Sequence, residues 1–118
     1  MSYQASEKKI PEGVFLVFNQ MVHPLNKSVT SLGRSANNDL VIQGEGISRL
    51  HAEIRYDYDE FTIYDMDSTN GIFINERPVK KYDLKSGTLF YLANIALVFV
   101  RDDAKVTDSL EMDTGELK

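Results

Sequence analysis

Cysteine is absent from this chain of 118 residues, which excludes a disulfide framework, a thiolate metal site and a cysteine nucleophile. Long apolar runs are also absent, because the longest, Ile95 to Val100, has only the length of a strand. The residues after Met1 show no basic segment followed by an apolar stretch, so no secretory signal is expected. Together these absences predict a cytoplasmic protein that does not contact a membrane.

Positive charge is scarce, since 13 Lys and Arg residues stand against 18 Asp and Glu residues. The resulting net charge of −5 has the wrong sign for a protein that binds the phosphate backbone of nucleic acids. The hydrophobic share of 42% and the charged share of 26% are ordinary for a globular chain. The length suits a single domain with a substantial core.

Apolar residues alternate with polar ones along the chain, and no window shows a helical period. Strands are expected at residues 14–18, 28–32, 39–42, 51–57, 60–65, 72–74, 88–92 and 94–100. The strand at 14–18 is expected to be buried on both faces. Short strands separated by Gly, Asn and Asp clusters are typical of an antiparallel β-sandwich, so the predicted fold class is all-β.

The connections add detail to this prediction. Tyr58-Asp59-Glu60 indicates a hairpin between two alternating strands. Gly44-Glu45-Gly46 and Asn70-Gly71 supply residues that tolerate a positive φ. Residues 77–81 are basic and are expected to form a solvated turn.

Three segments are expected in the chain. Residues 1–13 form a flexible arm, residues 14–100 the sandwich, and residues 101–118 an acidic, disordered tail. Thr107 and Thr114 in the tail are each followed by leucine three residues later. We hypothesise that one of them, once phosphorylated, occupies the binding site of its own chain or of a neighbouring copy.

The residues with binding chemistry gather in three loops rather than in the strands. These loops are residues 33–39, 46–51 and 67–71. Arg34 and Arg49 could each offer a rigid fork of donors to an oxyanion, while Ser48 and Thr69 add hydroxyl groups. Asn70 can both donate and accept. Loops at one end of a sandwich commonly carry binding residues, so a local anion site on an acidic body is expected.

The loop motifs, in this order and spacing, resemble the forkhead-associated (FHA) domain. The matching pieces are Gly33-Arg34, Asn38-Asp39-Leu40, Ser48-Arg49-Leu50-His51 and Asp67-Ser68-Thr69-Asn70-Gly71, followed by Asn75. The resemblance covers roughly Val14 to Val100 and implies two twisted sheets whose loops bind phosphothreonine peptides. The chain departs from the family pattern at Thr88, where aspartate is common, and at Ala93, where glycine is common.

The resemblance also implies a role for each matching residue. Arg34 and Ser48 would contact the phosphate, and Thr69 would support that end of the site. Asn70 would bind the peptide main chain after the phosphothreonine, while Arg49 would contact phosphate or peptide. The residues expected to shape the loops are Gly33, His51, Gly71 and Asn75.

Some of the same residues also suit two other chemistries, a hydrolytic triad and a calcium-binding loop. Ser48, His51 and an aspartate, Asp65 or Asp67, supply the side chains of a hydrolytic triad, but no nucleophile elbow or oxyanion loop accompanies them. Asp65, Asp67, Thr69 and Glu76 have the spacing of a calcium loop, yet Asn70 stands where that loop needs glycine. No catalysis, metal or cofactor is therefore expected.

The predicted function is a signalling module that recruits phosphothreonine-containing partners, either a kinase or a kinase substrate. The alternative is a phosphate-independent interaction module that uses a face of the same sandwich. Nucleic acids and membranes are not expected among the partners.

Overall fold

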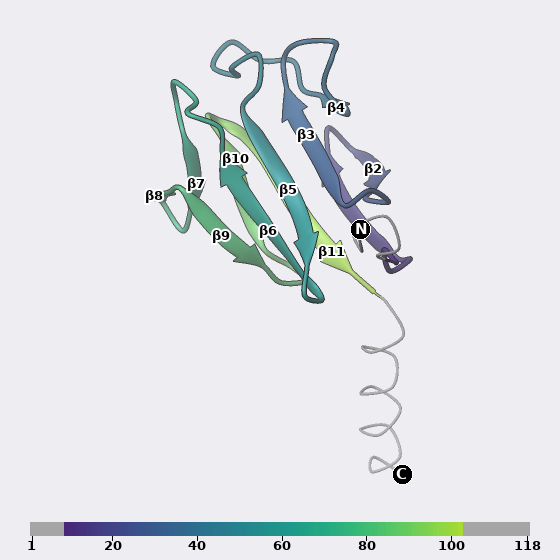
Figure 1. Cartoon of the computed structure of the whole chain (residues 1–118). Coiled ribbons are helices and arrows are strands. Elements are labelled where there is room, and N and C mark those ends of the chain that lie inside the picture. Colours follow the sequence, from purple (N-terminus) through teal and green to yellow (C-terminus); the bar gives the residue numbers. More distant parts are fainter. Residues whose placement is uncertain (1–8, 103–118) are drawn as a thin grey trace, which may run out of the picture.

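The computed structural model describes residues 9–102, which form two β-sheets packed face to face (Figure 1). One sheet has six strands, in the order β2 (Met21–Pro24), β1 (Val14–Phe18), β11 (Ile95–Arg101), β10 (Leu89–Leu92), β7 (Ile72–Ile74) and β8 (Arg77–Val79). The other has five, in the order β4 (Leu40–Val41), β3 (Val29–Gly33), β5 (Ala52–Asp57), β6 (Glu60–Asp65) and β9 (Lys81–Leu84). The predicted all-β sandwich is confirmed.

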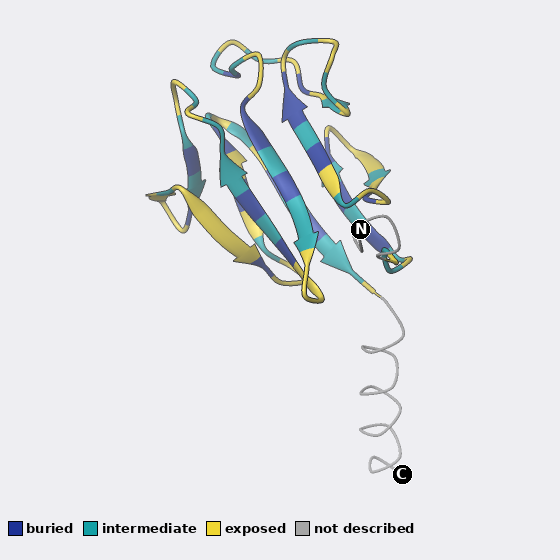
Figure 2. Cartoon of the chain, in the orientation of Figure 1, coloured by how far each residue is buried: buried dark blue, intermediate teal, exposed yellow. Residues whose placement is uncertain are grey.

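The core lies between the sheets because alternate residues of most strands point inward, as the banding along β3, β5 and β6 in Figure 2 shows. Phe61, Phe90 and Phe99 are its largest side chains and are almost fully buried. The rings of Phe61 and Phe99 meet across the two sheets with centroids 5.5 Å apart. Such aromatic contacts fix the spacing of the layers and hold the connecting loops in place.

Tight turns join several neighbouring strands. Tyr58 and Asp59, between β5 and β6, both have positive φ, so the predicted hairpin is confirmed with a two-residue turn. The pairs Asn19-Gln20 and Asn75-Glu76 make turns of the same kind. Residues other than glycine therefore adopt the left-handed backbone at these positions.

Four details of the strand prediction are wrong. β3 and β4 pair in parallel, so the five-stranded sheet is mixed rather than purely antiparallel. β2 was not expected, because it is an edge strand with mostly exposed residues. The expected basic turn at 77–81 is instead β8 and the start of β9. On β1, only alternate residues are buried and the others are half-buried.

The two ends of the described chain lie together. The Asp102 N–H donates to the Gly13 carbonyl oxygen at 2.8 Å, just outside β1 and β11. β11 runs away from the turn at Ala93, so Gly13 and Asp102 lie at the end of the sandwich opposite that turn. The predicted tail, with Thr107 and Thr114, lies outside the described residues, as does most of the predicted arm.

Both departures from the family pattern have a local explanation. The Thr88 hydroxyl accepts from the Lys85 N–H at 3.0 Å, and the Thr88 N–H donates to the Lys85 carbonyl at 2.8 Å, so Thr88 closes its turn. Ala93 has φ +55° in the turn between β10 and β11, a conformation that glycine adopts more readily. Within residues 9–102, no helix has the length and apolar character needed to cross a membrane.

Candidate functional site

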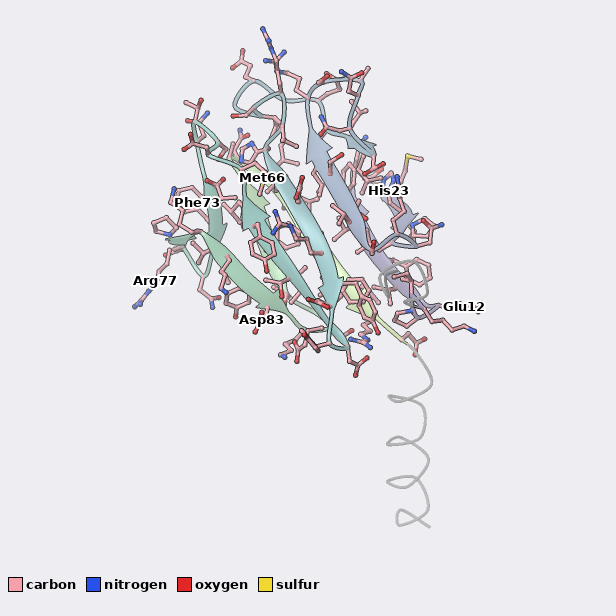
Figure 3. All side chains as sticks on the ribbon, in the orientation of Figure 1. Glu12, His23, Met66, Phe73, Arg77 and Asp83 are labelled. Carbon is pink, nitrogen blue, oxygen red and sulfur yellow. The ribbon has the colours of Figure 1, made fainter. Side chains whose placement is uncertain are left out.

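Three loops converge at one end of the sandwich, beyond the end of β3 and the start of β5 (Figure 1). We call them loop A (residues 34–39), loop B (residues 42–51) and loop C (residues 66–71). Backbone hydrogen bonds extend the sheet into them, since the Arg34 N–H donates to Ser48 O and the Ser35 N–H to Arg49 O. Loop C joins where the Met66 N–H donates to His51 O at 2.9 Å; Met66 is labelled in Figure 3.

Arg34 is exposed at the start of loop A, directly after β3. Its Nε donates to the Ile47 carbonyl of loop B at 3.0 Å, which fixes the plane of the guanidinium group. The two terminal nitrogens have no partner among residues 9–102. Arg34 is therefore held by one edge while the other edge remains available to an oxyanion.

Ser48 and Thr69 bring loops B and C together. The Thr69 backbone N–H donates to Ser48 Oγ at 3.0 Å, so the hydroxyl oxygen of Ser48 is already an acceptor. Within the described range, the Ser48 hydroxyl proton has no acceptor, and the hydroxyl group of exposed Thr69 has no hydrogen bond. Both hydroxyl groups can therefore donate to a ligand beside Arg34.

His51 is fully buried beneath these loops. Its Nδ1 accepts the Ser48 N–H at 3.1 Å, and its Nε2 lies 2.9 Å from the Gly71 carbonyl oxygen. An accepting Nδ1 places the proton on Nε2, which then donates to Gly71 O. One ring thus connects loop B to loop C.

Asn70 is exposed at the tip of loop C, and its side-chain amide donates to the Gly46 carbonyl at 2.9 Å. Its side-chain oxygen and second N–H have no partner in the described part of the chain. A hollow of about 470 Å³ adjoins it and is lined by Glu45, Gly46, Asn70, Phe73, Ala93 and Asn94. Asn70 can therefore both donate a hydrogen bond to a ligand and accept one from it at the edge of this hollow.

Glycine permits the close approach of the loops at two positions. A Cβ on Gly33 would lie 2.1 Å from the Arg49 carbonyl oxygen, and a Cβ on Gly46 would lie 2.9 Å from Ala93 Cβ. Of the glycines that could tolerate a positive φ, Gly71 adopts one, at +85°, whereas Gly44 and Gly46 do not. Gly46 is needed for space rather than for an unusual backbone conformation.

Asn38 and Asp39 fasten loop A, a role that the sequence analysis did not assign. Asn38 Nδ2 donates to the carbonyl oxygens of Ser35 and Arg49. Asp39 accepts from Lys27 Nζ and from the Ser31 N–H, and these hydrogen bonds hold the pKa of its carboxyl group below the usual value of 3.8. Short polar side chains that bond nearby backbone are common in loops, so residue type alone could have suggested this role.

Asp65 and Ser68 fasten loop C in a similar way. Ser68 Oγ donates to Asp65 Oδ1 and accepts the Gly71 N–H at 2.9 Å. The side chain of Asp65 is only 2% exposed, and Lys80 Nζ lies 3.6 Å from its Oδ2. Asp65 therefore acts from the end of β6 to position the loop that carries Thr69 and Asn70.

The structure brings most of the predicted site residues to one place. Arg34, Ser48, Thr69 and Asn70 lie on the three loops, and Gly33, His51 and Gly71 lie directly beneath or beside them. Arg49 is exposed on loop B, with no side-chain partner in residues 9–102. Asn75 is different, because it starts the turn at the far end of β7, with φ +52°.

The geometry disfavours a hydrolytic triad. Both ring nitrogens of His51 are engaged by backbone groups, so neither can take a proton from the Ser48 hydroxyl. The calcium-loop spacing is also disrupted, because Asp65 is bonded to Ser68 and Glu76 lies in the turn beyond β7. Among residues 9–102, no group of three or more His, Asp or Glu side chains could hold a metal ion.

Residues 30–93 match the FHA domain family. The glycogen accumulation regulator GarA of Mycobacterium tuberculosis is 34% identical over 76 residues, which are 64% of this chain and 47% of that protein. The oxoglutarate dehydrogenase inhibitor of Corynebacterium efficiens is 31% identical over 80 residues, 68% of this chain and 56% of that protein. The chain spans about half the length of these two relatives.

Solved structures agree with this match. An FHA domain studied for its phosphothreonine-dependent interactions superposes with a TM-score of 0.71 and 26% sequence identity. The match covers 75% of this chain and 96% of that domain. The likeness therefore extends over almost the whole of the compared domain.

Proposed function

Because the chain belongs to the FHA domain family, we propose that its loop end binds phosphothreonine-containing segments of partner proteins. The partner is a phosphorylated kinase or kinase substrate. The output is recruitment, since the loops offer hydrogen-bond donors to an anion and both ring nitrogens of His51 are engaged by backbone groups. The names of the two relatives, a regulator and an inhibitor, are consistent with such a role.

The observation that carries this proposal is the set of free donors around Arg34. The guanidinium group is fixed through Nε, and the hydroxyl groups of Ser48 and Thr69 lie on the loops packed against it. A phosphothreonine brings about −1.5 to −2 charges and three acceptor oxygens, which such donors can satisfy together. A carboxylate brings one charge in a flat group and would satisfy fewer of them.

The peptide main chain beyond the phosphothreonine would be held by Asn70. Its amide has both a donor and an acceptor left after bonding to Gly46. The hollow beside Asn70 would then take a peptide side chain, and Glu45 on its wall would disfavour an acidic one. Arg49, exposed on the same loop as Ser48, would add attraction for the phosphate or for nearby acidic residues.

Calorimetry with matched threonine, phosphothreonine, phosphoserine and aspartate peptides tests the proposal. The phosphothreonine peptide is expected to bind, and the threonine and aspartate peptides to bind much more weakly. Arg34→Ala should weaken phosphopeptide binding about ten- to a hundredfold, because charge-assisted hydrogen bonds to phosphate are lost. Ser48→Ala should have a smaller effect, since it removes a neutral donor.

Arg77→Ala is the matched control, because Arg77 is also exposed but lies on β8, at the end of β7 away from loop C. It changes the net charge by the same amount and should leave phosphopeptide affinity nearly unchanged. Equal binding of the threonine and phosphothreonine peptides would refute the proposal. So would an Arg34→Ala variant that binds like the parent.

A further inference from the structure

The outer faces of the two sheets differ sharply in chemistry. On the five-stranded sheet, the outward positions of β5, β6 and β9 carry mostly charged or polar side chains: Glu53, Arg55, Thr62, Tyr64, Lys81 and Asp83. Glu53 and Arg55 form an ion pair there, with the guanidinium group stacked 4.1 Å from the centroid of the Tyr64 ring. This is the polar, solvated face expected of an antiparallel sheet with one buried side.

The outer face of the six-stranded sheet is apolar instead. Cross-strand pairs place these side chains on one surface: Phe15, Val17, Leu89, Tyr91, Val98 and Val100, which together we call the apolar face. Phe73 on β7, labelled in Figure 3, extends it beside Tyr91, and Val22 on β2 extends it beside Val17. No charged residue occupies an outward position on the described strands of this sheet.

Nothing in the described part of the chain covers this surface completely. Leu89 is 47% exposed, Tyr91 38% and Val22 59%. The largest contiguous apolar patch of a protein often marks an interaction site, because apolar area is favourably removed from water. The sequences of β1 and β11 are consistent with a covered outer face. Both strands are apolar at successive positions, as in strands buried on both faces, although the fold buries only one face of each.

We propose that the apolar face is a dimer interface, and that its occupant is the same face of a second copy of this chain. Two sheets pack face to face about 10 Å apart when both surfaces are apolar and share a twist, and identical sheets meet this condition. A two-fold axis brings the same patch to both partners. The net charge of −5 does not oppose this, because the charged side chains of the strands lie on the other sheet's outer face and at the edges.

The size of the face predicts a reversible dimer. Six strands spaced about 4.8 Å apart, with outward residues over about 15 Å of their length, give roughly 400 Å² per partner. Stable interfaces bury about 800 Å² per partner, about twice this area, so the dimer is expected to be weak and transient. A dissociation constant of about 100 μM is expected, because complexes with about twice this area already include micromolar ones.

Such a dimer leaves the loop end free on both copies, because loops A, B and C project from the end of the sandwich and not from its face. Two binding sites would then be displayed by one assembly. A partner with two matching segments would bind more tightly than one with a single segment, without any new contact at the loops.

Sedimentation of the full chain across about 1 to 200 μM, the range around the expected dissociation constant, tests this proposal. The parent chain should shift from monomer towards dimer over this range. Leu89→Lys and Val98→Lys should each weaken association at least tenfold, because every substitution places two charges in a two-fold interface. Leu89 is the safer variant for folding, since its side chain is half exposed.

Val29→Lys is the matched control, because Val29 is 43% exposed but faces outward on the five-stranded sheet. It should dimerise like the parent chain, and all variants should melt near the parent temperature. A parent chain that stays monomeric up to the highest concentration overturns the proposal and leaves the face to another protein or to a terminal segment. A dimer that survives Leu89→Lys and Val98→Lys overturns it as well.

Discussion

At the scale of single residues, His51 connects loops B and C without itself being a proposed ligand contact. Its ring bonds to the Ser48 N–H on loop B and to the Gly71 carbonyl on loop C, and its own carbonyl accepts from Met66. The two bonds of the ring depend on a fully buried side chain, so water cannot replace them. The buried ring of His51 therefore helps to fix the position of the Ser48 hydroxyl group.

His51→Ala is expected to lower the free energy of unfolding by about 2–4 kcal/mol, because it leaves two backbone groups unpaired and a cavity in their place. Phosphopeptide binding should weaken as well, through disorder of loops B and C. Urea unfolding and calorimetry measure the two effects. A variant that unfolds like the parent yet binds no peptide would make His51 a direct ligand contact instead.

Residue chemistry alone predicted part of the site. Arg34, Ser48 and Thr69 were identified because guanidinium and hydroxyl groups suit an oxyanion, and the structure places them on adjoining loops. Asp65 and Ser68 were missed as a pair because their role depends on a hydrogen bond between the end of a strand and a loop. The need for glycine at position 46 could not be foreseen, since it arises from contact with Ala93 across the fold.

At the scale of elements, the strands that bury one face were predicted, whereas of the four edge strands only β4 was. β5 and β6 alternate clearly because one side meets the core. β2 and β8 lie at the two edges of their sheet, contain proline and bury little, so their pairing comes from the neighbouring strand rather than from their own pattern. The parallel pairing of β3 with β4 likewise depends on how loop A folds back.

The end of β3 is where an element directly limits the site. Gly33→Ala is expected to destabilise the fold by about 1–3 kcal/mol, because its Cβ would overlap the Arg49 carbonyl and push loop B away. Phosphopeptide affinity should fall with it, since the Arg34 N–H donates to Ser48 O across the same gap. Thermal unfolding and peptide titration measure these effects.

Gly87→Ala provides the comparison. A Cβ there meets nothing within 4 Å, but the φ of +93° strains any residue other than glycine. The variant should lose stability while keeping its peptide affinity, because Gly87 lies in the turn between β9 and β10, away from the loops. Equal losses of affinity in both glycine variants would show that general destabilisation, and not loop spacing, is responsible.

At the scale of the whole molecule, the sandwich separates its surfaces by chemistry. One outer face is charged, the other is apolar, and one end carries the loops with free donors. The sequence predicted the loop end because its motifs are local. The sequence indicated the apolar face only at residues 14–18, which were expected to be buried on both faces, and the continuity of the face required the register of β1, β10 and β11.

The pairing of Gly13 with Asp102 limits how far the following residues can reach. β11 separates that end from the loops by about 20 Å, the length of a seven-residue strand. Thr107 is five residues beyond Asp102 and can extend at most about 17 Å, whereas Thr114 is twelve residues beyond and can extend about 42 Å. Contour length therefore gives Thr114 ample reach to the loops of its own chain, whereas the fully extended main chain ending at Thr107 stops short of them.

Chains phosphorylated at a single position would separate the two cases. Phosphorylation of Thr114 should block an external phosphopeptide equally at every protein concentration, because the competitor is tethered. Phosphorylation of Thr107 should block it only as the protein becomes concentrated, because the occupied loops belong to another molecule. Fluorescence polarisation over a dilution series measures this, and dilution-independent blocking by Thr107 would contradict the geometry. If a phosphorylated threonine of residues 103–118 binds the loops, the length of one strand would thus decide whether it acts within a molecule or between molecules.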